Sequence, residues 1–399
     1  MNFPVFTSST TLFVYIKNSI IRCTVLTRGE TFLSLFHAFQ DTLKKYAQVL
    51  SQKFPPPMSI TSTAVISIAT ALTPGSSLPS GSYRIPPGEE VTICHVIDTC
   101  EYCADTVEAL QELIRDKIHP KHTSQVDMTT EQEEFYDVTA KGLRVLVSGL
   151  EHRVDTALRT EMSSQNWSTL DVVGEESSYV RSLHSIIQPF VESVQSLLPS
   201  SYFKNFCDKF ASSFITLYFT TIIRLKRISE LATQQLLLDV YNIKTLLLKI
   251  PVMQQKKTSS STATPLSNNA ATSSIIPPAL YTKMVTKEIS KVEIFLKLVG
   301  TPTDQLTEMF KAYWPNGTST DFQNVMNLKG MRRNDQQMLL DRMGLVDAKQ
   351  QQTTATATTA AVADNLQLIS DKTSYVADKV NSDLSSMRQK VDDFRKQFR

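Results

Sequence analysis

The chain has 399 residues, of which 41% are hydrophobic, and its 41 basic and 39 acidic side chains leave a formal net charge of +2. This near balance excludes the basic excess on which nucleic-acid binding by counterion release depends, so no nucleic-acid partner is expected. Eleven glycines are few for this length, and because tight hairpins and phosphate-binding loops both use glycine, the composition predicts an all-α protein.

Residues 1–54 form the first predicted helical segment, with a break near Gly29. Residues 55–88 begin with three prolines and are expected to be a Pro/Ser-rich loop. The most apolar run of that loop, Ala64 to Leu72, has nine residues, whereas a membrane-spanning helix needs about 20. We therefore expect no transmembrane segment.

Residues 89–250 are predicted to form a helical bundle, with breaks at Pro120, Gly174 and Pro199. Its apolar side chains recur every three or four residues, as in the row Ile93, Ile97, Cys100, Ala104, Val107, Ile114 and Ile118. A second row at helical spacing is aromatic and consists of Phe203, Phe206, Phe210, Phe214 and Tyr218, followed by Leu225. This second row indicates either core packing or a groove for a partner's helix.

The remaining segments alternate between helical and biased composition. We expect a low-complexity linker at 251–280, a C-terminal helical bundle at 281–346, a second low-complexity linker at 347–363, and an amphipathic tail helix at 364–399. The whole chain then predicts an elongated stack of antiparallel helical bundles, a helical rod, that ends in a coiled-coil-like helix.

The tail helix carries the candidate partner interface, because its apolar residues keep a strict four-three alternation. These residues are Val380, Leu384, Met387, Val391, Phe394 and Phe398. The pattern is typical of a coiled-coil seam, and both docking on the body of this chain and pairing with a partner helix fit it.

A segment from Asp321 to Leu340 is the most distinctive part of the sequence. Phe322, Val325, Met326 and Leu328 predict one amphipathic helix, Gly330 permits a turn, and Met338 and Leu339 are expected to face the core from a second helix. The signature residues are Phe322, Val325, Leu328, Lys329, Gly330, Gln336 and Leu339.

The order of these residues resembles a segment of the vacuolar protein sorting-associated protein 53 family, whose members are subunits of the Golgi-associated retrograde protein complex, a membrane tether. Two further segments are similar to that family, namely Ser9 to Lys17 followed by Cys23, and Ile93 to Cys103. The family's N-terminal half, a long helical region through which the subunits associate, has no counterpart in this chain.

The resemblance implies a helical rod that helps capture endosome-derived vesicles at the trans-Golgi network. It also implies the other complex subunits, SNAREs and small GTPases as partners. The expected location is the cytosolic face of the trans-Golgi network and endosomes, with the protein peripheral and held at membranes through its partners. An exocyst-like scaffold or adaptor of another trafficking complex is the alternative, followed by an enzyme with an unrecognised helical active site.

No catalytic, cofactor-binding or metal-binding residue is predicted. The most metal-like group is Cys94, His95, Cys100 and Cys103, but on one helix Cys94 and Cys103 point to opposite sides and cannot close around one ion. An odd total of five cysteines does not form a disulfide framework and indicates a reducing, cytosolic setting. The sequence also contains no phosphate-binding loop or hydrolase motif.

Overall fold

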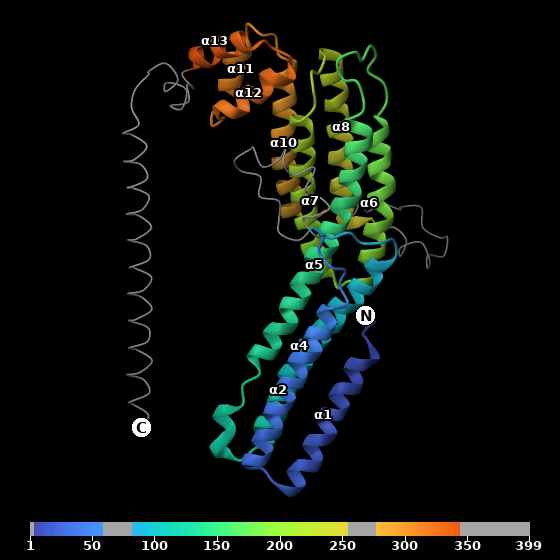
Figure 1. Ribbon diagram of the computed structural model, residues 1–399, viewed down its shortest axis with the longest axis vertical. Coiled ribbons are helices and arrows are strands. Elements are labelled where there is room, and N and C mark those ends of the chain that lie inside the picture. The colour runs from blue at the N-terminus through green and yellow to red at the C-terminus, as the bar shows by residue number, and fades with distance from the viewer. Residues whose placement is uncertain (1–3, 59–81, 254–276, 344–399) are drawn as a thin grey trace, which may run out of the picture. The chain divides into compact units, whose positions relative to one another are not determined.

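The computed structural model describes residues 4–58, 82–253 and 277–343, and within these ranges it contains eleven α-helices and no β-strand (Figure 1). The predicted all-α fold is confirmed. The chain divides into two compact units, residues 1–342 and 343–399, and the helices described below belong to the first unit. The predicted tail helix and the linker before it lie outside the described residues.

The first bundle is made of two helical hairpins. Its helices are α1 (Thr7–Leu26), α2 (Glu30–Ser51), α4 (Glu89–Lys117) and the first half of α5 (Thr129–Ala157). The break between α1 and α2 falls at the expected Gly29, and α4 is joined to α5 through a short 3₁₀ helix (Pro120–Gln125). The apolar row predicted from Ile93 to Ile118 lies in the buried core of this bundle, which explains its helical spacing.

The second bundle combines the other half of α5 with four helices of 20 to 24 residues. These are α6 (Ser178–Leu197), α7 (Ser200–Ile223), α8 (Glu230–Lys249) and α10 (Ala279–Gly300). Two single turns, Leu158–Met162 and Ile250–Val252, extend α5 and α8. Three short helices follow, namely α11 (Leu306–Tyr313), α12 (Ser319–Leu328) and α13 (Arg333–Met343). Helix α11 contacts α10, and helix α12 contacts both α10 and α7.

Helix α5 is shared by the two bundles (Figure 1). Its two interior glycines allow close approach of neighbouring chain segments: a Cβ at Gly142 would lie 2.7 Å from Ile97 Cγ1, and one at Gly149 would lie 2.2 Å from Ile85 Cδ1. Farther along the helix, Arg153 lies over the Phe190 ring of α6 at 5.0 Å and donates a hydrogen bond to the Ile85 carbonyl. Contacts from both halves of one helix therefore hold the bundles together.

The aromatic row of α7 is core. Phe203, Phe206, Phe210, Phe214 and Tyr218 are all buried, and successive rings lie about 6 Å apart. The groove alternative is therefore wrong for this row. The prediction that Leu225 continues the row is also wrong, because α7 ends at Ile223 and Leu225 is only partly buried in the following loop.

The cysteines of α4 are part of the core as well. Cys94, Cys100 and Cys103 are fully buried and free, and burial raises the pKa of the Cys100 thiol to about 12. A buried thiol with a raised pKa stays protonated and behaves as a small apolar side chain.

Candidate functional site

The signature segment begins with a well-capped helix. Thr318 Oγ1 accepts a hydrogen bond from the Asp321 amide at 3.1 Å, while Asp321 Oδ2 accepts one from the Thr318 amide at 3.0 Å. This reciprocal pair satisfies two amides that the first turn would otherwise leave without partners. The Thr-x-x-Asp spacing is the sequence signal for this cap, and it fixes where α12 starts although neither residue is among the signature residues.

The apolar face of α12 is buried as expected. Phe322, Val325, Met326 and Leu328 have at most 1% of their surface exposed. The Phe322 ring lies 4.7 Å from the Phe310 ring of α11, centroid to centroid. The signature therefore joins the short C-terminal helices to one another and to the second bundle.

Lys329 connects α12 to the end of α10. Its Nζ donates hydrogen bonds to the carbonyl oxygens of Val299 at 2.8 Å and Thr301 at 2.6 Å. These carbonyls lie at the C-terminus of α10, where the helix dipole favours a positive charge. Burial lowers the pKa of Lys329, and the nearby Glu230 carboxylate opposes that shift.

We expect Lys329→Met to lower the free energy of unfolding by about 1–3 kcal/mol, because two partly buried carbonyls lose a charged donor. Urea denaturation followed by circular dichroism measures the change. Lys311→Met on the exposed side of α11 is the matched control and should change stability by less than about 0.5 kcal/mol. Equal effects of the two substitutions would contradict this role of Lys329.

Gly330 ends α12 in a left-handed turn with φ of +70°. The Met331 amide donates to the Met326 carbonyl at 3.1 Å and the Gly330 amide to that of Asn327 at 2.9 Å, which is the hydrogen-bond pattern of a Schellman motif. A Cβ at this position would also lie 2.8 Å from Arg227 Cδ. The turn contacts the loop between α7 and α8, where the Ile228 amide donates a hydrogen bond to the Leu328 carbonyl.

Substitution of Gly330 by valine should therefore destabilise the protein by about 1–3 kcal/mol, since a β-branched residue is strained at positive φ and would push Arg227 away. Thermal denaturation measures this. Gly174→Val provides the comparison, because Gly174 is not at positive φ and a Cβ there would meet nothing within 4 Å beyond its chain neighbours. A larger loss at Gly174 than at Gly330 would contradict the strain argument.

The second signature helix differs from the prediction. Gln336, and not an apolar residue, is the buried side chain of α13, with its Nε2 donating to the Met331 carbonyl at 2.9 Å and to Asn327 Oδ1 at 3.1 Å. Leu339 is only partly buried, and Met338 is 64% exposed, so the expectation that Met338 faces the core is wrong. The short, polar helix is anchored by hydrogen bonds near its start and not by an apolar stripe.

The other candidate interface, the seam from Val380 to Phe398, lies outside the described residues. No helix in the described part of the chain is long and apolar enough to cross a membrane.

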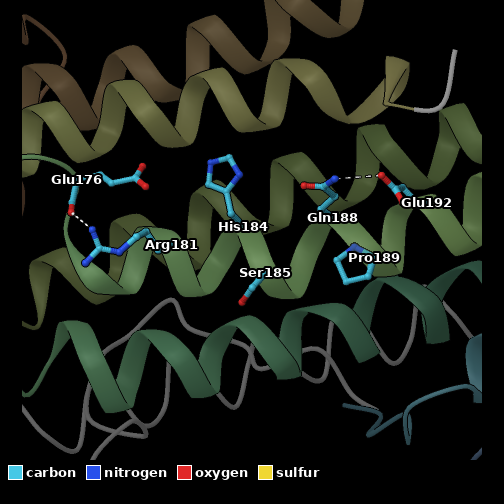
Figure 2. Close-up of a pocket in the computed structure, with 7 residues that line it drawn as sticks. All are labelled: Glu176, Arg181, His184, Ser185, Gln188, Pro189 and Glu192. Carbon is cyan, nitrogen blue, oxygen red and sulfur yellow. Dashed lines mark hydrogen bonds between the residues drawn. The ribbon is translucent and has the colours of Figure 1, made fainter. Parts of the chain in front are cut away.

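A surface hollow beside α6 is lined mainly by polar side chains. The cavity has a volume of about 380 Å³, and Figure 2 shows the residues that line it, most of which belong to α6. It is lined by Glu176, Arg181, His184, Ser185, Gln188, Pro189 and Glu192. Arg181 donates to the Glu176 carbonyl at 3.3 Å and Gln188 donates to the Glu192 carboxylate at 3.1 Å. These two hydrogen bonds join residues on α6 or just before it and do not pair a nucleophile with a base, so they define no catalytic arrangement.

Comparisons with known proteins give two family matches and a similar solved structure. The family model described as exocyst complex component Sec6 matches residues 24–271, and the one described as vacuolar protein sorting-associated protein 53 C-terminus matches residues 234–331. The crystal structure of the C-terminal domain of the exocyst subunit Sec6p superposes with a TM-score of 0.52 at 12% identity, over 86% of this chain and 79% of that chain. At that identity the likeness concerns the fold alone.

Two curated relatives match nearly the same share of the chain. Vacuolar protein sorting-associated protein 53 A of Arabidopsis thaliana is 35% identical over 337 residues, which are 84% of this chain and 37% of the relative. The vacuolar protein sorting-associated protein 53 homolog of Caenorhabditis elegans is 26% identical over 343 residues, 84% of this chain and 40% of the relative. The chain spans about two fifths of the length of these relatives.

The helical fold and the Sec6 match over more than half of the chain define a protein of the tethering-complex class. Within this class, the chain is a vacuolar protein sorting-associated protein 53-like protein.

Proposed function

We propose that this chain acts as a non-enzymatic subunit of a multisubunit vesicle-tethering complex in retrograde transport from endosomes to the trans-Golgi network. The observation that carries the proposal is the similarity to vacuolar protein sorting-associated protein 53 along 84% of the chain. The described structure supports a scaffold, because its signature joint uses Lys329 and Gly330 to hold helices together.

The proposed partners are the other subunits of the Golgi-associated retrograde protein complex, together with SNAREs and small GTPases. The proposed location is the cytosolic face of the trans-Golgi network and endosomes, with membrane attachment through these partners. A stack of helices provides separate surfaces along its length, which suits a protein that must hold several partners at once.

Affinity purification of the tagged chain, followed by quantitative mass spectrometry, tests the proposal. We expect enrichment of the other subunits of the retrograde complex, with exocyst subunits at background. Enrichment of exocyst subunits alone would overturn the retrograde assignment and support the exocyst-like alternative, which the Sec6 family match favours.

The tail seam is proposed to contribute to partner binding. Deletion of residues 364–399, or the pair Leu384→Asp and Val391→Asp, should leave the melting temperature unchanged and reduce co-purification of the partners, since charged residues cannot be buried in an apolar seam. A fall in melting temperature would instead show that the tail docks on this chain. Unchanged stability with unchanged partners would mean that the seam has no role in either.

A further inference from the structure

Helix α1 carries large apolar side chains on two opposite faces. On its inner face, Phe13, Ile16 and Ile20 are buried against α2 and α4. On its outer face, Val14 is 58% exposed, Ile21 53% and Val25 81%. A helix that is apolar all round is normally buried all round. Figure 1 shows α1 at the edge of the first bundle, where its outer face is left uncovered by the described helices.

The exposed residues follow the spacing of a coiled-coil seam. Val14, Asn18, Ile21 and Val25 are separated by four, three and four residues, and Asn18 is exposed with them. In heptad notation Val14 and Ile21 take position d, while Asn18 and Val25 take position a. Branched apolar residues with a single asparagine at position a are typical of a specific helix pair, in which the asparagine fixes the register.

The charged residues beside this seam have one sign. Lys17 and Arg22 take the flanking positions g and e, and α1 contains no acidic residue. Position e and position g side chains form the salt bridges across a helix pair and thereby select the partner. The complementary helix must therefore present Asp or Glu at these flanks.

We propose that the outer face of α1 binds an amphipathic helix of another polypeptide, whose apolar seam is flanked by acidic residues. The proposal concerns a binding surface that either tethering complex could use, so it does not depend on which complex the chain joins. The exposed seam is the outer face of α1 formed by Val14, Asn18, Ile21 and Val25.

Charge favours an acidic partner helix over two other possible occupants of the outer face of α1, namely a second copy of this chain and its own tail. A second copy of α1 would place Lys17 and Arg22 of one chain near the same basic residues of the other, which is repulsive. The tail seam of this chain is also a poor match, because three of the four charged residues at its flanks are basic, namely Arg388, Lys390 and Arg395, against Asp383. Like charges across a helix pair are destabilising.

The test uses two synthetic helical peptides of three heptads, with Leu at the seam and one Asn at position a. One carries Glu at positions e and g, and the other carries Lys. Fluorescence anisotropy measures binding of each labelled peptide to the full chain at low salt. We expect the acidic peptide to bind about tenfold or more tightly than the basic one, and its binding to weaken as salt is raised.

Two variants connect this binding to α1. The pair Ile21→Asp and Val25→Asp should abolish binding of the acidic peptide. The charge reversal Lys17→Glu with Arg22→Glu should exchange the preference, so that the basic peptide binds better. Val172→Asp, at a position that is 73% exposed away from α1, is the matched control and should bind like the wild type. Circular dichroism confirms that all variants stay folded, which is expected since every changed side chain lies on the surface.

Several outcomes would overturn the proposal. Equal binding of the two peptides, or binding that survives the Asp substitutions, would exclude the exposed seam as the site. Concentration-dependent dimerisation that these substitutions remove would assign the face to a second copy. Peptide binding that is seen only after deletion of 364–399 would assign it to the tail. Binding to phosphatidylserine vesicles that is lost in the Asp variant, with no peptide binding in the wild type, would assign it to a membrane surface.

Discussion

Phe322→Ala is expected to lower the free energy of unfolding by about 3–5 kcal/mol, since the ring is completely buried and its removal leaves a cavity. The ring contacts Phe310 of α11 and lies on the helix whose end is held by Lys329 and Gly330. The loss should therefore separate the short C-terminal helices from the second bundle. Urea denaturation followed by circular dichroism gives the change.

Tyr313→Ala provides the matched control for this substitution. Tyr313 is also an aromatic residue of the C-terminal helices, but it is 52% exposed at the end of α11. Its truncation should cost less than about 1 kcal/mol. If the two substitutions had similar effects, the signature segment would not be the joint that its burial indicates.

The sequence is sufficient to predict the helical fold and much of the joint. Helix breaks at Gly29, Pro120 and Pro199 are local events, because glycine and proline act on the backbone where they occur. The burial of Phe322 and Leu328 follows from spacing on a single helix. These predictions depend on residues that are close in the chain.

The errors concern contacts between residues that are distant in the chain. Glu131 lies in the first turn of α5, and only the tertiary structure shows that it is fully buried, with its carboxylate 3.1 Å from Lys44 Nζ of α2. Met338 matches a helical apolar pattern, yet no described helix covers that side of α13, and the residue is exposed. Spacing identifies a face, whereas only the tertiary arrangement determines what covers it.

The same reasoning explains why the exposed seam of α1 does not stand out in the sequence. Ile16 and Ile20 cannot be distinguished there from Val14 and Ile21, because both sets recur at helical spacing. The structure separates them by burial: the first pair is 1% exposed and the second pair more than half exposed. An apolar residue that is predicted to be core can therefore belong to a binding surface, and in a scaffold protein this ambiguity affects the residues that matter for function.

The buried carboxyl groups of this fold differ in whether they have hydrogen-bond partners. Asp239 is fully buried, but its carboxylate accepts hydrogen bonds from the Ser177 amide at 3.0 Å and the Ser177 hydroxyl at 2.7 Å, and from Gln235 Nε2 at 3.3 Å. Asp98 of α4 is 3% exposed, and neither of its carboxylate oxygens has a hydrogen-bond partner among the described residues. An unpartnered buried carboxylate favours its neutral form.

Burial, with a smaller contribution from the nearby Glu101 carboxylate, raises the pKa of Asp98 from 3.8 to about 8. In the folded state Asp98 therefore keeps its proton up to about pH 8, whereas in the unfolded state it loses the proton near pH 4. The unfolded state binds fewer protons between these values, so stability must fall as the pH rises through this window. The slope from this residue alone is about 1.4 kcal/mol per pH unit.

Asp98→Asn removes the ionisable group while keeping nearly the same shape. We expect the variant to be more stable than the wild type by up to about 4 kcal/mol at pH 7, and to differ little from it at pH 4, where the aspartic acid is protonated in the folded state and about half protonated in the unfolded state. Urea denaturation at pH 4, 5.5, 7 and 8.5 measures the difference, which should grow up to about pH 8 and then level off. Subtracting one curve from the other cancels carboxyl groups with raised pKa values that do not interact with Asp98, such as Asp208.

Glu108→Gln separates this effect from a general change in charge. Glu108 lies on the same helix and is exposed, so its substitution removes one negative charge without relieving a buried one. Its stability curve should run parallel to that of the wild type at every pH. If Asp98→Asn also gave a parallel curve, Asp98 would have to be ionised and solvated in the folded protein. If both variants converged with the wild type only at low pH, the dependence would come from the summed surface charge of α4 and not from the buried carboxylate.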